Sequence, residues 1–327
     1  MKGCGAGSGN GGMGRGWPFR FGQGTIVVLL LVAVVWSGCK PGARQVVIIY
    51  TSQDQVYAEP ILKEFEQETG IKARAVFDSE ATKTVAIANR LLAERRHPQC
   101  DVYWGNEELR TRQLAAQNIF RETNAWAAVG HRSRRLVINT NKLTLATAPR
   151  SLIELTNTAW RGRVAMAYPL FGTTATHFLA LRQHWGESNW LSWCRALAAN
   201  KPLIVEGNSM AAKFVARGEA WVGLTDSDDI AAEQRAGAPV VALPLSLETL
   251  LIPNTIAVIR GAPHPGAAQQ LFDFLQRRTV VERLIAVNAL EGFSVETVSE
   301  RTLKPDWNAL LLDLTASTES LKAIFLR

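Results

Sequence analysis

The stretch VVIIYTSQDQVYAEPILKEFEQETGIKARAVF, from Val46 to Phe77, indicates the fold of this chain. Its start, Gln45–Thr51, is short, rich in β-branched residues and almost wholly apolar, which is typical of a strand buried in a parallel sheet. Residues 56–69 place apolar side chains at helical spacing, and Gly70 follows where a helix C-cap belongs. Residues 71–77 then have the pattern of a second strand. The stretch therefore predicts a strand–helix–strand unit in a sheet covered by helices.

The same alternation continues along the chain. Helices at 82–96 and 107–117 and a strand at 101–104 complete a first set of elements. A second set of strands and helices is predicted at 163–168, 174–184, 202–205, 209–217, 220–224 and 230–235, followed by a long apolar strand at 250–258 and helices that start near 265 and 280. Two such sets predict an α/β protein with two doubly wound sheets flanked by helices.

The N-terminal region has the three parts of a bacterial export signal. Residues 25–36 are apolar and uncharged, basic residues precede them, and a Ser-Gly-Cys sequence ends at Cys39. The apolar run is shorter than the roughly 20 residues that span a bilayer. We therefore expect residues 1–38 to be a signal peptide, with Met13 as an alternative start. The Ser-Gly-Cys ending resembles a lipobox and predicts lipidation of Cys39; an ordinary signal peptide is the alternative.

Composition excludes several functional classes. The formal net charge of +7 belongs partly to the export signal, and no concentrated basic stripe suggests nucleic-acid binding. Residues 39–327 contain no GxSxG, HExxH, P-loop or GxGxxG motif, so an enzyme is not expected. Cys100 and Cys194 lie far apart in the sequence, without a CxxC pattern, and we expect two unpaired thiols.

Candidate ligand contacts lie in the loops that follow the strands, because ligands of open parallel sheets bind at the carboxyl ends of the strands. These candidates are Ser52, Gln53, Asp54, Trp104, Asn106, Gly172, Thr173, Thr174, Asn208 and Asp226. Asp54 and Asn106 are equally compatible with helix capping. Gly172–Thr174 precedes a helix and is a candidate anion cradle.

The most acidic loop is Thr225–Asp229. Asp226, Asp228 and Asp229 lie within four residues, just after an apolar strand. One interpretation is a helix N-terminus, where a cap and two acidic side chains favour the helix dipole. The other is a site for a hard cation such as Ca²⁺, Mg²⁺ or Fe³⁺, which prefers oxygen ligands.

The chain resembles a solute-binding lipoprotein of an ABC uptake system, of the ferric-iron-binding type in the extracellular solute-binding protein family. The stretch quoted above carries the resemblance, together with CDVYWGNEELRTRQLAAQNIF, GNSMAAKFVARGEAWVGLTDSDD and LLIPNTIAVIRGAPHPGAAQQLFDFL. The resemblance implies a two-lobed periplasmic binding protein fold of type II, with a hinge of crossover segments. It implies a first lobe of residues 45–142 plus 253–303, a second lobe of residues 143–252 plus 304–327, and a tether at 39–44.

The resemblance also implies where a ligand binds. In ferric-binding members, two adjacent tyrosines hold the iron, often helped by a histidine and a glutamate. Here the tyrosine positions are Asp228 and Asp229, the histidine position is Asp54, and the glutamate position is Asn106. All four positions therefore depart from the family pattern, and Asp54, Asp228 and Asp229 form the expected metal site. The positions that hold a companion anion correspond to Gly172, Thr173, Thr174 and Asn208.

These observations predict the solute-binding component of an ABC importer, with ferric iron or another hard cation as the transported ligand rather than a resident cofactor. An anionic or zwitterionic solute such as a phosphonate is the second hypothesis, and an exported enzyme on the same two-lobed frame is the third. The expected partners are a permease and an ATPase, and the expected state is a periplasmic, lipid-anchored monomer. A carboxylate site predicts that cation affinity falls as the pH drops through about 4–5.

Overall fold

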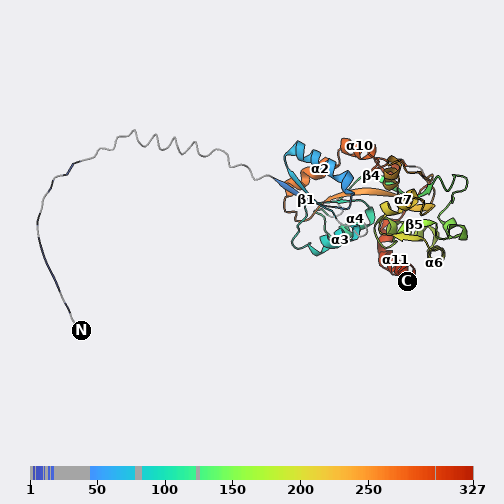
Figure 1. Ribbon diagram of the computed structural model, residues 1–327. Coiled ribbons are helices and arrows are strands. Elements are labelled where there is room, and N and C mark those ends of the chain that lie inside the picture. Colours follow the sequence, from blue (N-terminus) through green and yellow to red (C-terminus); the bar gives the residue numbers. More distant parts are fainter. Residues whose placement is uncertain are drawn as a thin grey trace. The chain divides into compact units, whose positions relative to one another are not determined.

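The computed structural model describes residues 45–77, 83–122, 126–298 and 300–326, with a few scattered residues among the first 17. The predicted signal peptide's apolar run, Cys39 and the tether at 39–44 lie outside the described residues. Within the part described, no helix combines the length and hydropathy required to cross a membrane. Figure 1 shows the strands at the centre of the 45–326 region with helices around them.

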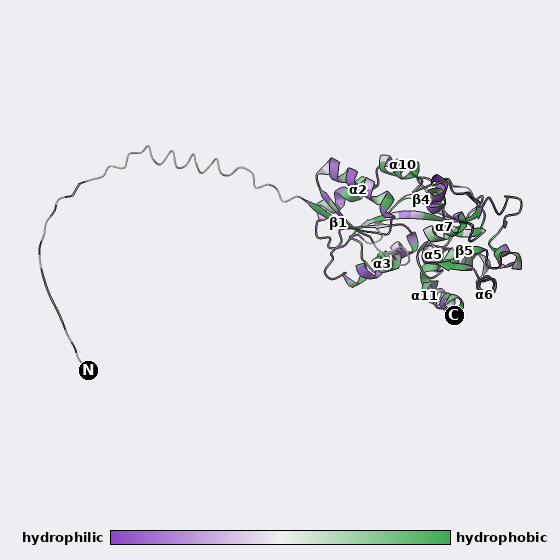
Figure 2. Ribbon diagram, viewed as in Figure 1, coloured by the Kyte–Doolittle hydropathy of each residue, from purple (hydrophilic) through white to green (hydrophobic). Residues whose placement is uncertain are grey.

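The first set of strands is parallel, as predicted. β1 (Val46–Thr51) pairs with β2 (Lys72–Val76) on one side and with β3 (Val102–Gly105) on the other. The connecting helices are α2 (Gln55–Thr69) and α3 (Lys83–Ala93), and α4 (Glu108–Ala116) follows β3. Gly70 ends α2 with φ +70°, a left-handed conformation that glycine adopts without strain, so the predicted C-cap is confirmed. Figure 2 shows hydrophilic residues along α2 and hydrophobic ones in the strands.

The second set is also parallel and forms the other end of the sheet. Its strand order is β7-β5-β6, from β5 (Val164–Ala167), β6 (Leu203–Val205) and β7 (Val222–Asp226). The helices of this set are α5 (Gly172–Trp185), α6 (Glu187–Ala199), α7 (Asn208–Ala216) and α8 (Ser227–Arg235). α6 was not predicted, although Trp190, Trp193, Cys194 and Leu197 are buried along one side of it.

Two long strands join the sets. β4 (Ala127–Asn139) and β9 (Leu250–Val258) pair with each other in antiparallel register; β9 also pairs with β3, and β4 with β7. The strand order is therefore β2-β1-β3-β9-β4-β7-β5-β6, with β8 (Val240–Ala242) paired to β4. Two strand sets were expected, but they are not separate sheets, because these two crossover strands continue from one set into the other.

The first half of β4 is irregular. The pairing with β9 shifts register between Ala128 and His131, and Gly130 has φ +73°. A side chain at Gly130 would lie 2.6 Å from Leu290 and 2.9 Å from the Gly292 carbonyl oxygen, so only glycine fits. At this point His131 donates its N–H to Gly292, and it faces Pro253 of β9, which has no N–H to give. The irregular part of β4 therefore lies between the segment of β9 that pairs with β3 and the segment of β4 that pairs with β7.

Among the described residues, four hydrophobic clusters cover the two ends of the sheet. Two of them surround the first strand set, one containing Phe65 and Phe274 and the other containing Tyr103 and Phe120. The other two surround the second set and include the buried Trp190. The lobe limits stay a prediction. Cys100 and Cys194 are free and buried in different clusters, which confirms the expected unpaired thiols.

The remaining helices complete the covering of the sheet. α9 (Pro265–Leu275) and α10 (Arg278–Ala286) pack on the first set, and α11 (Trp307–Phe325) contacts α5, α6 and α4. Short 3-10 helices occur at η1 (Ile153–Thr156), η2 (Thr158–Trp160) and η3 (Val295–Thr297).

Candidate ligand-binding site

The candidate site begins with two buried arginines on β4. Arg132 and Arg134 are two residues apart, and side chains at that spacing point to the same face of a strand. Both side chains are almost fully buried. Arg134 lies opposite Asp226, the last residue of β7, in the antiparallel register. The sheet thus places two guanidinium groups beside the acidic loop that the sequence singled out.

Asp226 is the counter-ion that both arginines share. Its carboxylate accepts hydrogen bonds from Arg134 Nη1 at 2.7 Å and from Arg132 Nη2 at 3.1 Å. Thr173 Oγ1 donates to it at 2.9 Å, and Asn208 Nδ2 lies at 3.3 Å. Burial alone would raise the pKa of Asp226, but the guanidinium groups of Arg134 and Arg132 hold it below the usual value. Asp226 is therefore a fully bonded anion inside the protein.

The residues of the predicted anion cradle lie together, and two of them donate hydrogen bonds to Asp226. Thr173 and Thr174 lie in the first turn of α5, and Asn208 opens α7, so two helix N-termini meet beside the carboxylate. Asn208 Oδ1 accepts from Arg134 Nη1 at 2.6 Å and from Thr174 Oγ1 at 3.1 Å. These donors are used within the protein. The Asp226 side chain occupies the place where the resemblance implied a companion anion.

Asp228 lies in the first turn of α8 and differs from its neighbour. It is 4% exposed, and its nearest cation is Arg132, whose Nε lies 3.4 Å from Asp228 Oδ1. Within the described residues, Asp228 Oδ1 has no hydrogen-bond partner. Burial raises the pKa of Asp228 to about 7, and the nearby Asp226 and Asp54 carboxylates add to that rise against the effect of Arg132. At neutral pH this carboxyl group is only partly ionised.

Asp226, Asp228 and Asp229 form the only group among the described residues that could hold a metal ion. One ligand atom from each lies within 4.8 Å of the others. Asp229 accepts a hydrogen bond from Thr225 Oγ1 at 3.2 Å. Asp226 is the N-cap residue of α8, as the helix-terminus interpretation predicted, but its side chain makes no capping bond. Asp228 and Asp229 do lie in the first turn, where a helix dipole favours negative charge.

The loop after β1 supplies the facing side of the site. Asp54 is the N-cap residue of α2, but its side chain makes no capping bond, and its charge acts on Asp228 and Arg132. Gln53 is 2% exposed; its Oε1 accepts from Asn254 Nδ2 at 2.8 Å, and its Nε2 has no partner among the described atoms. Asn254 in turn accepts from Arg132 Nη1 at 3.3 Å. We call Asp54, Asp226, Asp228 and Asp229, with Arg132 and Arg134, the acidic site.

The other predicted contacts lie in the loop after β3. Asn106 is buried, and its N–H donates to Ser52 Oγ at 2.9 Å, which joins the loops after β1 and β3. Asn106 does not cap α4. Glu107 does, by accepting from the N–H groups of Leu109 and Arg110, and its carboxylate also accepts from Thr176 of α5. Trp104 packs fully buried in the first-set core, and its indole N–H has no partner in the described part of the chain.

Sequence reasoning missed the two arginines, Asn254 and Glu107. The available signal for the arginines was the Arg-Ser-Arg alternation just before the apolar residues of β4, because a period of two places both on one face of a strand. No local signal connects Asn254 to Gln53, since 201 residues separate them in the sequence.

Residues 46–284 match the family model described as bacterial extracellular solute-binding protein. This match covers most of the chain and spans both strand sets. The chain belongs to that family. The family consists of binding proteins rather than enzymes, and it implies an extracytoplasmic location, a small ligand and an ABC transporter as partner.

Individual relatives agree with this assignment. The major ferric iron-binding protein of Neisseria meningitidis serogroup B is 23% identical over 302 residues, which cover 84% of this chain and 89% of that protein. Iron-bound HitA from Pseudomonas aeruginosa matches with a TM-score of 0.73 at 18% identity. The match covers 86% of this chain and 99% of HitA. AfuA from Actinobacillus pleuropneumoniae, solved with fructose-6-phosphate, has a TM-score of 0.74 at 21% identity, covering 87% of this chain and 99% of AfuA. The mixed α/β fold is therefore that of periplasmic binding proteins, and it accommodates more than one kind of ligand.

Proposed function

We propose that this protein is the solute-binding component of an ABC importer and that it captures a hard cation, ferric iron first, between its two lobes. The observation that carries the proposal is Asp228. It is a buried carboxylate with its pKa raised to about 7 and with one oxygen that lacks a hydrogen-bond donor. A bound cation would add positive charge beside this carboxylate, where Arg132 at 3.4 Å is outweighed by burial and the neighbouring carboxylates.

The charges around Asp228 also favour a cation. The acidic site holds two guanidinium groups and four carboxylates, so its fully ionised form is net negative. Asp226 is bonded to both arginines and serves as their counter-ion. The proposed ligands are then Asp228 and Asp229, whose oxygens already lie close together, with Asp54 of the facing loop, whose charge acts on Asp228. Three carboxylates and ordered water suit a hard cation, although they lack the phenolates of the ferric-binding relatives.

A zwitterionic solute such as an aminophosphonate is the second candidate. The specific observation in its favour is the buried Gln53 Nε2, a donor without a partner in the described residues, close to the Arg132–Asn254 contact. An ammonium group would bind Asp228, and the phosphonate would accept hydrogen bonds from Gln53 and Arg132. A purely anionic solute is disfavoured by the excess of carboxylates.

The experiment is a titration of metal-free protein with ferric nitrilotriacetate and, separately, with 2-aminoethylphosphonate, followed by tryptophan fluorescence at pH 7.5. We expect iron to bind and the Asp228→Asn, Asp229→Asn double variant to lose at least a hundredfold in affinity. The matched control is the Asp273→Asn, Glu282→Gln double variant, which removes two exposed carboxylates elsewhere and should bind as the wild type does. If the protein binds the aminophosphonate but not iron, the zwitterion is the ligand and the cation proposal is wrong. If it binds neither, both candidates are wrong.

We also propose that a lipid on Cys39 anchors the protein, on the basis of the Ser-Gly-Cys sequence. Cys39→Ala should move the protein from the membrane fraction to the soluble fraction, while a conservative change at Cys100 should not. A Cys39→Ala protein that stays in the membrane fraction would contradict the lipid anchor.

A further inference from the structure

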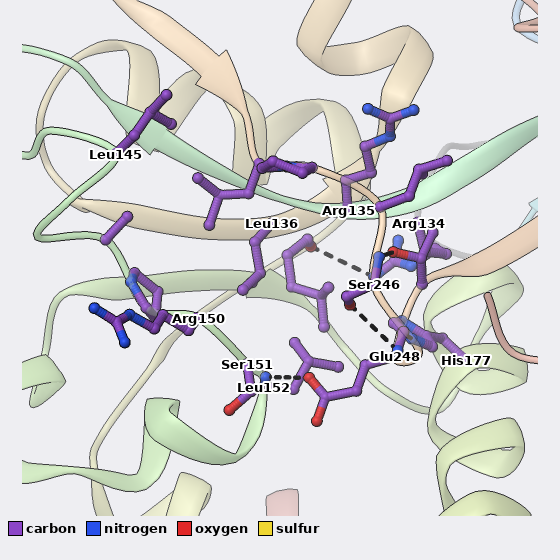
Figure 3. Close-up of a pocket in the computed structure, with 17 residues that line it drawn as sticks. Arg134, Arg135, Leu136, Leu145, Arg150, Ser151, Leu152, His177, Ser246 and Glu248 are labelled. Atoms are coloured by element: carbon purple, nitrogen blue, oxygen red, sulfur yellow. Dashed lines mark hydrogen bonds between the residues drawn. The ribbon is translucent and has the colours of Figure 1, made fainter. Parts of the chain in front are cut away.

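A second cavity lies beside β4, apart from the acidic site. Its volume is about 300 Å³, at the small end of the range for ligand pockets. β4, α5 and the loops at 145–152 and 243–249 line it, and Figure 3 shows their side chains. Arg134 is the only residue that it shares with the acidic site.

One end of the cavity has two buried polar atoms without partners. His177 is 1% exposed, and its Nε2 lies 2.7 Å from the carbonyl oxygen of Glu248. A carbonyl oxygen only accepts, so His177 Nε2 carries the proton and Nδ1 is an acceptor. Burial, reinforced by Arg134, lowers the pKa of His177 to about 3, so the ring is neutral. Within the described residues, neither His177 Nδ1 nor Arg134 Nε has a hydrogen-bond partner. This end therefore offers one acceptor and one donor.

The middle of the cavity is apolar. Leu136 of β4, Leu152, Leu224 and Leu243 line it, and Leu152, Leu224 and Leu243 are buried. These side chains offer an aliphatic surface to a ligand and no hydrogen bonds.

The far end of the cavity contains Arg150. Figure 3 shows Arg150 and His177 on opposite sides of the cavity, and Arg150 is exposed. In the part of the chain that the structure describes, the Arg150 guanidinium forms no salt bridge. The other charged groups here already have partners. Arg135 pairs with Glu291 at 2.6 Å, the Glu248 carboxylate accepts from the Leu152 N–H, and the Glu154 carboxylate accepts from the Arg150 backbone N–H at 2.9 Å. Arg150 is thus the group that a ligand's negative charge would meet.

We propose that this cavity is a second binding site, for an aliphatic hydroxy acid. The hydroxyl oxygen accepts a hydrogen bond from Arg134 Nε, and the hydroxyl proton is donated to His177 Nδ1. The aliphatic chain lies on the leucines, and the carboxylate pairs with Arg150. A hydroxyl is the smallest group that can both accept one hydrogen bond and donate another, as these two atoms require. This proposal does not depend on the ligand of the acidic site.

The test is calorimetry of the full-length protein with 4-hydroxybutanoate, 6-hydroxyhexanoate and 8-hydroxyoctanoate at pH 7.5. We expect at least one to bind, and its counterpart without the hydroxyl to bind about tenfold more weakly, because it leaves buried polar atoms unpaired. Arg150→Gln should lower the affinity for the hydroxy acid about threefold, as expected for the loss of an exposed ion pair, and should leave the affinity for the matching diol unchanged. Arg161→Gln, at another exposed arginine, is the control.

The Asp228→Asn, Asp229→Asn variant separates the two sites. Its affinity for the hydroxy acid should equal that of the wild type, whether or not its affinity for iron changes. Binding by none of the three hydroxy acids would overturn the proposal, as would equal affinity for the acid without the hydroxyl, or a hydroxy acid that the Asp228→Asn, Asp229→Asn variant no longer binds.

Discussion

Asp226 and Asp228 are two residues apart and equally buried, but their pKa values shift in opposite directions. The pKa of Asp226 is held low by two guanidinium groups, with Thr173 and Asn208 also donating to it. The pKa of Asp228 is raised to about 7, because burial and neighbouring carboxylates outweigh a single arginine at 3.4 Å. Burial is the same for both, so the partners decide the difference. Asp226 is bonded within the protein, whereas Asp228 is the carboxylate that we propose binds the cation.

The largest expected effect concerns Asp226 and its ion pair with Arg134. Arg134→Met should lower the free energy of unfolding by about 3–5 kcal/mol, because it removes one partner of a buried ion pair and leaves Asp226 poorly compensated. Urea denaturation at pH 7, followed by tryptophan fluorescence, measures this loss. Arg161→Met, at an exposed position, should change it by less than about 0.5 kcal/mol. A loss below 1 kcal/mol at Arg134 would mean that Asp226 does not need that partner.

The second prediction concerns Asp228. Here the substitution should raise the free energy of unfolding, whereas Arg134→Met should lower it. The folded pKa of Asp228, about 7, is above the unfolded value of about 3.9. Its contribution to stability is therefore fully present when the group is protonated at low pH, and it is lost as the pH rises through about 7. Asp228→Asn should stabilise the metal-free protein by about 1–3 kcal/mol at pH 8 and by much less at pH 4.

The measurement is urea denaturation of the wild type and Asp228→Asn at both pH values. Asp226→Asn is the matched variant, and it should destabilise at pH 8, because it removes the anion between the two arginines. If Asp228→Asn and Asp226→Asn destabilise equally, the two carboxylates have the same role and the comparison is broken.

The smallest predicted effect concerns a single hydrogen bond to Asp226. Thr173→Val keeps the side-chain shape but removes the donor to the carboxylate, at a cost of about 1.5 kcal/mol in unfolding free energy. The same variant should leave iron affinity within about twofold of the wild type, since Asp226 is not a proposed ligand. Calorimetry and denaturation of one preparation measure both quantities. A large fall in iron affinity would place Asp226 among the ligands.

Local patterns predicted much of the fold. The apolar run of β9 was predicted with its observed limits, and α2 with its glycine C-cap needs only the residues around it. β4 was largely missed, because its centre contains the sequence HRSRR, whose charges are typical of an exposed surface. Those charges are buried only because Asp226, 92 residues after Arg134, lies opposite on β7. A contact of that kind leaves no local signal.

The same reason limits what the sequence predicts about the site. The acidic loop and the threonine cradle were predicted as separate features. In the structure, Asp226 of the acidic loop accepts a hydrogen bond from Thr173 of the cradle. The expected loss of cation affinity near pH 4–5 assumed ordinary carboxylates. With the pKa of Asp228 raised to about 7 by burial, that loss is now expected near pH 7.

The most direct test of the central claim is the ratio of iron affinities of the wild type and Asp228→Asn, measured from pH 5.5 to 8 with ferric nitrilotriacetate as the donor. The ratio cancels the chelator's own dependence on pH. If a cation binds at Asp228, this carboxyl must lose its proton, so the ratio should rise about tenfold per pH unit below pH 7 and level off above it. A ratio near one that does not change with pH would show that Asp228 does not hold the cation.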